Sequence, residues 1–244
     1  MQYGLVGEKL GHSYSKEIHE SLGFYQYELY PVSKEELVEL LETRNFLGLN
    51  VTIPYKQTVM PYCDYLAPIA KQIGAVNTLY FNAQRKLCGT NTDYYGFCYA
   101  MKEAGIVVET KTVLILGDGA TSKTVTWAVK QMGAAKIVIA SRREQEFQEN
   151  NPVIRVNYAD LHRVDRIQVI INTTPVGMYP NVEQRPIDLT QFPDCEGVFD
   201  VIYNPEKTKL LAQAEELGIR CSGGIKMLTA QAEEAARYFT HRKE

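Results

Sequence analysis

Two glycines form the clearest chemical pattern in the chain. Gly117 and Gly119 stand in the stretch TVLILGDGATSKTVTWAVKQMGAAKIVIASRR, between an apolar segment that predicts a strand and an amphipathic segment that predicts a helix. Glycines let the backbone turn tightly and approach a ligand closely, and the N–H groups that open a helix favour an anion. The place of this turn favours a pyrophosphate site over its alternative, an ordinary βαβ turn.

The residues after the second strand of this βαβ unit indicate which nucleotide would bind. NAD-specific folds usually place an acidic residue there for the ribose hydroxyls, whereas this chain has Ser141, Arg142 and Arg143. Guanidinium groups suit a 2′-phosphate, so the two arginines favour NADP over NAD. The alternative is a solvated basic end of a strand.

A second group of polar residues follows predicted strands nearer the start of the chain. Asn50, Thr52 and Lys56 stand at the end of the apolar strand FLGLNVT, and amides and an acid stand near the ends of two segments, 73–80 and 86–93. Ligands bind at the carboxyl ends of strands in open α/β sheets. We therefore expect these polar side chains to line a ligand site.

The predicted elements that position these residues form two sets of strands with crossover helices. Ser15 is the expected cap of the first helix, and SKEE from Ser33 is a capping box. The first set has strands at 2–6, 25–30 and 46–52, helices at 16–22, from Ser33 and at 94–105, and a strand pair with a turn at 82–85. The second set has strands at 112–116, 136–140, 153–156, 168–172 and 198–201, and helices to about Met132, at 206–217 and at 225–242.

This order predicts an α/β fold of two domains. We expect residues 1–99 and 223–244 to form an α/β domain with a small, mostly parallel sheet, since its strands are joined by helices. Residues 100–222 are expected to form a Rossmann-like, doubly wound domain, and the last helix is expected to return to the first domain.

Composition narrows the class of protein. The 244 residues include 26 basic and 29 acidic side chains, a net charge of −3, which gives no reason to expect a nucleic-acid or membrane partner. The five cysteines form no C-x-x-C pair and the chain begins without a leader pattern, so we expect a cytoplasmic protein with reduced thiols. The four histidines form no metal-binding pattern, and no metal is expected.

Six motifs in order resemble those of the shikimate dehydrogenase family over almost the whole chain. They are Gly11-His12-Ser13-Tyr14-Ser15 with His19, Asn50-Val51-Thr52-Ile53-Pro54-Tyr55-Lys56, Gly74-Ala75-Val76-Asn77-Thr78, Asn91-Thr92-Asp93, Asn172 to Met178, and Gly224 with Met227, Leu228 and Gln231. The resemblance implies a substrate-binding first domain and an NADP-binding second domain.

The resemblance also implies roles for particular residues. Ser13 and Ser15 would bind the shikimate carboxylate, and Tyr203 would lie near the substrate. Lys56 and Asp93 would form the catalytic pair at the reacting hydroxyl, and which of the two accepts the proton stays open. The hydroxyl-binding residues would be Asn50, Thr52, Lys56, Asn77, Asp93 and Gln231.

For the cofactor, the resemblance implies contacts along the carboxyl edge of the second sheet, although Met178 could instead be part of the core. The cofactor-binding residues would be Gly117, Gly119, Ala120, Thr121, Ser141, Arg142, Arg143, Thr173, Pro175, Met178 and Gly224. The chain departs from the family pattern at Lys16 and Glu20, where proline and asparagine are usual, and at Asp118, which places a carboxylate in the glycine turn. A carboxylate there would weaken diphosphate binding unless it faces solvent.

We therefore expect an NADP-dependent shikimate dehydrogenase, which reversibly reduces 3-dehydroshikimate to shikimate in aromatic amino-acid biosynthesis. One alternative is a paralogue that acts on quinate, although Ser15 would crowd the extra hydroxyl of quinate. Another is a non-catalytic sensor of shikimate or nucleotide on the same fold. The expected partners are small molecules, and the chain is expected to be a monomer or a homodimer.

Overall fold

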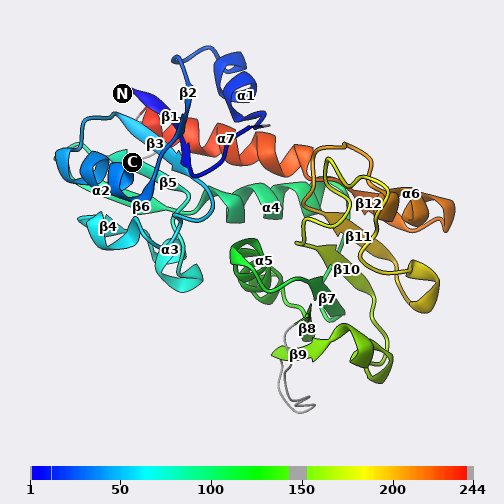
Figure 1. Ribbon diagram of the computed structural model, residues 1–244. Helices are drawn as coiled ribbons and strands as arrows, with labels where there is room; N and C mark the ends of the chain where they lie inside the picture. Colours follow the sequence, from blue (N-terminus) through cyan, green and yellow to red (C-terminus); the bar gives the residue numbers. More distant parts are fainter. Residues whose placement is uncertain (1, 12, 143–152, 241–244) are drawn as a thin grey trace. The chain divides into compact units, whose positions relative to one another are not determined.

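The computed structural model describes residues 2–11, 13–142 and 153–240, and the chain divides into two compact units (Figure 1). The first comprises residues 1–96 and 228–244, and the second comprises residues 97–227. The boundaries fall within two helices, α4 (Thr92–Glu103) and α7 (Ile225–Phe239). Each unit contains one six-stranded sheet.

The sheet of the first unit has the strand order β2-β1-β3-β5-β6-β4. Its strands are β1 (Tyr3–Gly7), β2 (Glu28–Pro31), β3 (Gly48–Val51), β4 (Tyr65–Leu66), β5 (Thr78–Phe81) and β6 (Leu87–Thr90). Only β5 runs antiparallel to its neighbours among the described strands, so the sheet is mostly parallel, as predicted. The predicted strand pair is confirmed as β5 and β6, and Asn82 Oδ1 accepts hydrogen bonds from the N–H groups of Gln84 and Lys86 in its turn.

Capping residues were predicted for two helices of the first unit, and one of these predictions is confirmed. The unit contains α1 (Ser15–Ser21), α2 (Lys34–Thr43), the 3₁₀ turn η1 (Met60–Tyr62), α3 (Pro68–Ile73), the start of α4 and most of α7. The capping box of α2 is confirmed, with Ser33 Oγ and Glu36 each bonded to the other's backbone N–H. The prediction that Ser15 caps α1 is wrong, because Tyr14 is the N-cap and Ser15 is the first helical residue.

Two apolar clusters hold this unit together. Leu37, Leu41, Leu49 and Leu79 are almost fully buried between the sheet and the helices around it. On α7, Phe239 packs with Leu5 and Tyr27 of the sheet region. A Cβ at Gly48 would lie 2.4 Å from the Phe239 ring, so this close packing requires glycine.

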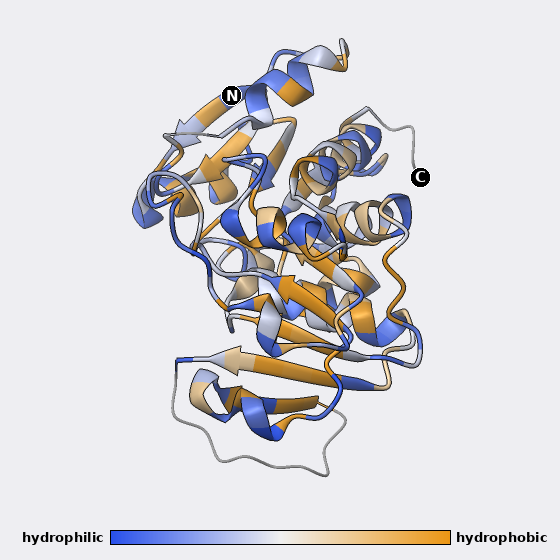
Figure 2. Ribbon diagram, turned by 90° about the vertical axis from the view of Figure 1, so that its right-hand side faces the viewer, coloured by the Kyte–Doolittle hydropathy of each residue, from blue (hydrophilic) through white to orange (hydrophobic). Residues whose placement is uncertain are grey.

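The sheet of the second unit has the order β12-β11-β10-β7-β8-β9, and its described strands are all parallel. Numbered within the unit, this is the Rossmann order 3-2-1-4-5-6, so the predicted doubly wound sheet is confirmed. Figure 2 shows the hydrophobic residues concentrated on the strands. The strands are β7 (Thr112–Leu116), β8 (Lys136–Ser141), β9 (Val153–Asn157), β10 (Val169–Asn172), β11 (Gly197–Asp200) and β12 (Arg220–Ser222).

The helical elements of this unit are α5 (Ala120–Gln131), α6 (Lys209–Glu216), and the 3₁₀ helices η2 (Tyr158–Arg163) and η3 (Leu189–Gln191). The sequence pattern predicts α6 from residue 206, but the helix begins at Lys209 because the hydroxyl of Thr208 caps it by accepting from Leu211 N–H. Among the described helices, none is both long and apolar enough to cross a membrane.

Candidate functional site

The polar residues of the first unit meet at one edge of its sheet. The carboxyl ends of β3 and β6 lie beside the amino end of β5, because β5 is antiparallel to both. In this register Asn50 pairs with Thr78, and Thr78 pairs with Thr90. The strand ends therefore bring together residues that stand about 40 positions apart in the sequence.

Lys56 and Asp93 form an ion pair at this edge. Lys56 Nζ lies 2.6 Å from Asp93 Oδ2, and the two side chains are 13% and 15% exposed. Asp93 lies in the first turn of α4, where Asn91 Oδ1 accepts a hydrogen bond from Tyr94 N–H. A nearly buried ammonium and carboxylate in contact can share, accept or release a proton.

A network of buried amides and hydroxyls adjoins this pair. The backbone N–H of Thr92 donates to Asn77 Oδ1 at 2.7 Å, which fixes the orientation of the Asn77 amide. Asn77 Nδ2 therefore donates to Gln231 Oε1 on α7, and the Thr92 hydroxyl lies 3.2 Å from the same oxygen. Thr78 joins Asn77 to Asn50, whose Nδ2 donates to Thr78 Oγ1. Thr78 and Thr92 belong to motifs of the sequence but were not predicted as site residues.

A buried aromatic pair supports Asn50 from the side of α1. Tyr27 donates from its hydroxyl to Asn50 Oδ1 at 2.8 Å, and its ring stacks on His19 with centroids 4.0 Å apart. His19 Nδ1 lies 2.8 Å from the Tyr25 hydroxyl. Burial lowers the pKa of His19 to about 3, so the ring is neutral at neutral pH. Sequence reasoning missed Tyr27, because its partner Asn50 is 23 residues away.

The two predicted carboxylate ligands lie side by side at the start of α1. Ser13 Oγ donates to Ser15 Oγ at 3.0 Å and accepts from the backbone N–H of Ser15. The departures from the family pattern on this helix are compensated locally, since Lys16 Nζ lies 2.6 Å from Glu28 and 3.9 Å from Glu20. Thr52 follows β3 and is held by its N–H, which donates to Val6 O.

In the second unit, the glycine turn joins β7 to α5 as predicted. Gly117 has φ +101°, and a Cβ there would lie 2.9 Å from Thr173 Oγ1, so both conformation and packing require glycine. Gly119 is the N-cap of α5 without a side-chain cap, and nothing lies within 4 Å of the position of an added Cβ. The first N–H groups of a helix have no intrahelical partner. The N–H groups of Ala120 and Thr121, which follow Gly119, are therefore candidates to bind an anion.

The other predicted cofactor residues at this edge follow β10 and β12, and Tyr203, which was predicted to lie near the substrate, follows β11. Thr173 lies against the turn, donating from Oγ1 to Leu116 O at 2.6 Å. Pro175 and Met178 are exposed, Met178 by 42%, which excludes the core alternative for Met178. Tyr203 is partly buried beyond β11. A Cβ at Gly224 would lie 2.1 Å from Val201 O, so backbone packing alone requires this glycine.

The basic residues beyond β8 are only partly within the described chain. Ser141 is the buried last residue of β8 and Arg142 is exposed, whereas Arg143 lies outside the described residues. Asp118 in the glycine turn is not directed freely into solvent, because its side chain is 17% exposed and its Oδ1 lies 4.0 Å from Arg155 Nε on β9. This guanidinium offsets the charge of the carboxylate.

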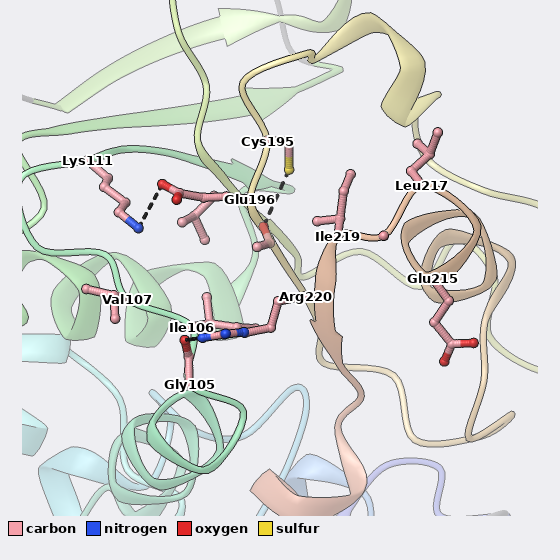
Figure 3. A pocket seen from close by; sticks show the side chains of 13 residues that line it. Gly105, Ile106, Val107, Lys111, Cys195, Glu196, Glu215, Leu217, Ile219 and Arg220 are labelled. Carbon is pink, nitrogen blue, oxygen red and sulfur yellow. Dashed lines mark hydrogen bonds and ion pairs between the residues drawn. The ribbon is translucent and has the colours of Figure 1, made fainter.

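A cavity of about 800 Å³ lies at the opposite edge of the same sheet (Figure 3). Its lining includes residues at the amino ends of four parallel strands, among them Lys111, Val169, Gly197 and Arg220. Lys111 pairs with Glu196 at 2.7 Å, and Arg220 donates to Gly105 O, so these charges already have partners. The candidate residues lie at the carboxyl edge instead. In the described chain, no group of three or more His, Cys, Asp or Glu side chains is arranged to hold a metal.

Comparison with known proteins gives consistent similarities. The family model for the shikimate dehydrogenase substrate binding domain matches residues 5–79. A protein from Clostridium beijerinckii named Shikimate dehydrogenase (NADP(+)) is 39% identical over 96% of this chain and 89% of its own length.

Two solved structures are similar over nearly the whole fold. Shikimate Dehydrogenase 1 from Peptoclostridium difficile is 34% identical, with a TM-score of 0.87 over 98% of this chain and 92% of that chain. Quinate dehydrogenase from Corynebacterium glutamicum in complex with NAD is 30% identical, with a TM-score of 0.85 over 99% of this chain and 94% of that chain.

Proposed function

We propose that this chain, which belongs to the shikimate dehydrogenase family, is an NADP-dependent shikimate dehydrogenase. It reversibly reduces 3-dehydroshikimate to shikimate. The observation that carries the proposal is the 2.6 Å Lys56–Asp93 ion pair beside the buried amide and hydroxyl network. The name of the C. beijerinckii relative supports both the substrate and the cofactor.

Lys56 and Asp93 are proposed as the catalytic residues. Oxidation of a secondary alcohol requires that its hydroxyl proton leave as the hydride leaves the carbon, and reduction requires the reverse. The ion pair can hold and move this proton at the substrate oxygen, with one member bonded to the oxygen and the other orienting it. Both side chains are mostly shielded from water, which strengthens their effect on the reacting atoms.

The remaining polar residues are proposed to recognise the substrate. A cyclic acid with several hydroxyls needs a matched donor or acceptor for each group, because an unpaired buried polar atom costs about 1–3 kcal/mol. Asn50, Thr52, Asn77 and Gln231 supply amides and a hydroxyl for this purpose. Ser13 and Ser15 are proposed to receive the carboxylate end, and the 3.0 Å contact of the two serine hydroxyls supports their acting together. Tyr203 of the second unit is proposed as a further substrate-binding residue.

The residues of the second unit fit NADP. When bound, the cofactor supplies or accepts the hydride. Gly119 offers open space and uncapped N–H groups for a diphosphate, and Gly117 permits the turn. Arg142, with Arg143 and Ser141, is proposed to bind the 2′-phosphate. The proposed cofactor set also includes Ala120, Thr121, Thr173, Pro175, Met178 and Gly224.

Quinate is the alternative substrate, and the similarity to a quinate dehydrogenase keeps it testable. Ser15 favours shikimate, since its side chain would crowd the additional hydroxyl of quinate. A monomer or homodimer and a cytoplasmic location belong to this proposal too. The five cysteines are free thiols, which supports a reducing compartment.

A steady-state assay of shikimate and quinate, each with NADP and NAD, tests the function. We expect turnover to be fastest with shikimate and NADP. Lys56→Ala should lower kcat by roughly a hundredfold or more, since one positioned proton-transfer group contributes about 10²–10⁴-fold. Lys71→Ala, which changes an exposed lysine of the same unit, is the matched control and should leave kcat unchanged. Tight shikimate binding in calorimetry without turnover on either cofactor would instead support a sensor.

A further inference from the structure

Asp200 is a buried carboxylate that the proposed mechanism does not use. It ends β11, is 0% exposed, and accepts three hydrogen bonds. Asn172 Nδ2 donates to its Oδ1 at 3.0 Å, the backbone N–H of Ile202 donates to the same oxygen at 3.1 Å, and the Thr208 hydroxyl donates to Oδ2 at 2.8 Å. Burial raises the pKa of this carboxyl to about 6. Keeping such a group buried calls for an explanation.

The first partner connects Asp200 to the segment that follows β10. The N–H and hydroxyl of Thr174 both donate to Asn172 Oδ1, at 3.0 and 2.7 Å, so the Asn172 amide nitrogen must face Asp200. The same nitrogen lies 3.4 Å from Val176 O. Asn172 is 0% exposed and thus has one fixed arrangement. Through it, Asp200 holds the backbone of residues 173–176.

The other two partners of Asp200, Ile202 and Thr208, belong to the segment that follows β11. The N–H of Val201 donates to Asn172 O at 3.1 Å, and the N–H of Tyr179 donates to Asn204 O at 3.0 Å. Thr208 donates to Asp200 while it caps α6. The two segments, 172–179 and 201–208, are therefore bonded to each other around a single carboxylate.

We propose that Asp200 is a positioning residue for the nicotinamide half of the cofactor. Through Asn172 and Thr208 it fixes the two segments that carry Thr173, Met178 and Tyr203. It does not act on the adenosine half, whose proposed residues follow β7 and β8. The inference rests on the proposed function, because that proposal places the nicotinamide along these segments.

Binding of two ligands to the full-length chain tests the inference. NADPH contains both halves of the cofactor, whereas adenosine 2′,5′-bisphosphate lacks nicotinamide. For Asp200→Ala we expect the Kd of NADPH to rise roughly tenfold or more, as for loss of hydrogen bonds to a buried charged group. The Kd of the bisphosphate should stay within about twofold of the wild-type value, since its contacts are unchanged.

Two further variants separate positioning from folding. Asp200→Asn keeps Oδ1 as the acceptor for Asn172 and Ile202, and its amide can donate to the Thr208 hydroxyl, so NADPH affinity should be retained. Thr208→Val removes the bond to Oδ2 together with the cap of α6 that the same hydroxyl provides, and it should weaken NADPH binding in the same direction by a smaller factor. Asp188→Ala removes another aspartate that caps a short helix in this unit, and it should change neither Kd.

The outcomes are distinct from those that test the function. Three results would each overturn the positioning role. Asp200→Ala could raise the Kd of both ligands equally, Asp200→Ala could bind NADPH with wild-type affinity, or Asp200→Asn could lose affinity for NADPH. If Asp200→Ala does not fold, Thr208→Val and Asp200→Asn decide the question, because the Kd of NADPH can be compared with the Kd of the bisphosphate in each of them. A wild-type chain that binds NADPH but does not oxidise shikimate would overturn the proposed function. The positioning role would still be judged from the two Kd values.

Discussion

The two units build their candidate sites from different groups. In the first, the polar atoms are side-chain amides and hydroxyls, such as Asn77 and Thr92, which are buried and bonded to one another. In the second, they are backbone N–H groups beside Gly119 and the exposed guanidinium of Arg142. A cyclic ligand that carries several hydroxyl groups needs donors and acceptors in fixed directions, whereas a phosphate needs only donors and positive charge. The difference therefore matches the two ligands proposed for the units.

Each site has a buried group behind it whose shifted pKa affects stability, His19 in the first unit and Asp200 in the second, and the two groups have opposite effects of pH. Folding lowers the pKa of His19 from 6.5 to about 3, so His19 supports stability above pH 6.5, and this support is lost as the pH falls toward 3. Folding raises the pKa of Asp200 from 3.8 to about 6, so its support is present below pH 3.8 and is lost as the pH rises through 6.

The largest expected effect follows from this opposition. The variant His19→Asn has no titrating group at this position. Between pH 6.5 and 3 it should therefore lose less unfolding free energy than the wild type, by on the order of 5 kcal/mol. Asp200→Asn should abolish an opposite change on the order of 3 kcal/mol between pH 3.8 and 6. Urea denaturation at several pH values measures both as differences in slope from the wild type. Equal slopes in all three proteins would contradict the burial argument.

The second prediction concerns the side-chain network of the first unit. Thr92→Val leaves Asn77 Nδ2 and Gln231 Oε1 each without one of their partners, so kcat/KM for shikimate should fall roughly 10- to 100-fold. Thr92→Ser restores the hydroxyl and should remain within about threefold of the wild type. The Kd of NADPH, measured by fluorescence titration, is the control and should not change. Wild-type kcat/KM in Thr92→Val together with a loss in Thr92→Ser would show that packing of the methyl group, and not the hydroxyl, matters.

The contrast between the units also explains what could be predicted from the sequence. Apolar runs predicted five strands of each sheet, whereas the short strands β4 and β12 were not predicted. The glycine turn was confirmed because its geometry is local to residues 117–119. The network around Thr78 and Thr92 was missed because it depends on the register of β3, β5 and β6, which brings distant residues together. The prediction that Ser15 caps α1 was wrong by one position, since Tyr14 is the cap and Ser15 is the first residue of the helix.

Departures from the family pattern were visible in the sequence, but their compensation was not. Lys16 and Glu20 stand on one helix, while Glu28, which pairs with Lys16 at 2.6 Å, lies on β2. In the same way Asp118 follows β7 and its partner Arg155 lies on β9, two strands away in the sheet. An unusual charge can be read from its position, whereas the opposite charge that offsets it requires the fold.

The smallest expected effect tests this compensation in the second unit. Arg155→Ala leaves the Asp118 carboxylate with less positive charge near the proposed diphosphate site, so NADPH should bind more weakly. Because the Arg155 side chain is 49% exposed, we expect only about a two- to fivefold rise in Kd, typical of an exposed pair. Asp118→Asn in the Arg155→Ala background should restore the wild-type Kd, and 0.5 M salt should reduce the difference to roughly nothing by screening. Fluorescence titration at low and high salt measures this, and a loss that persists in the double variant would mean that Arg155 acts on the cofactor directly.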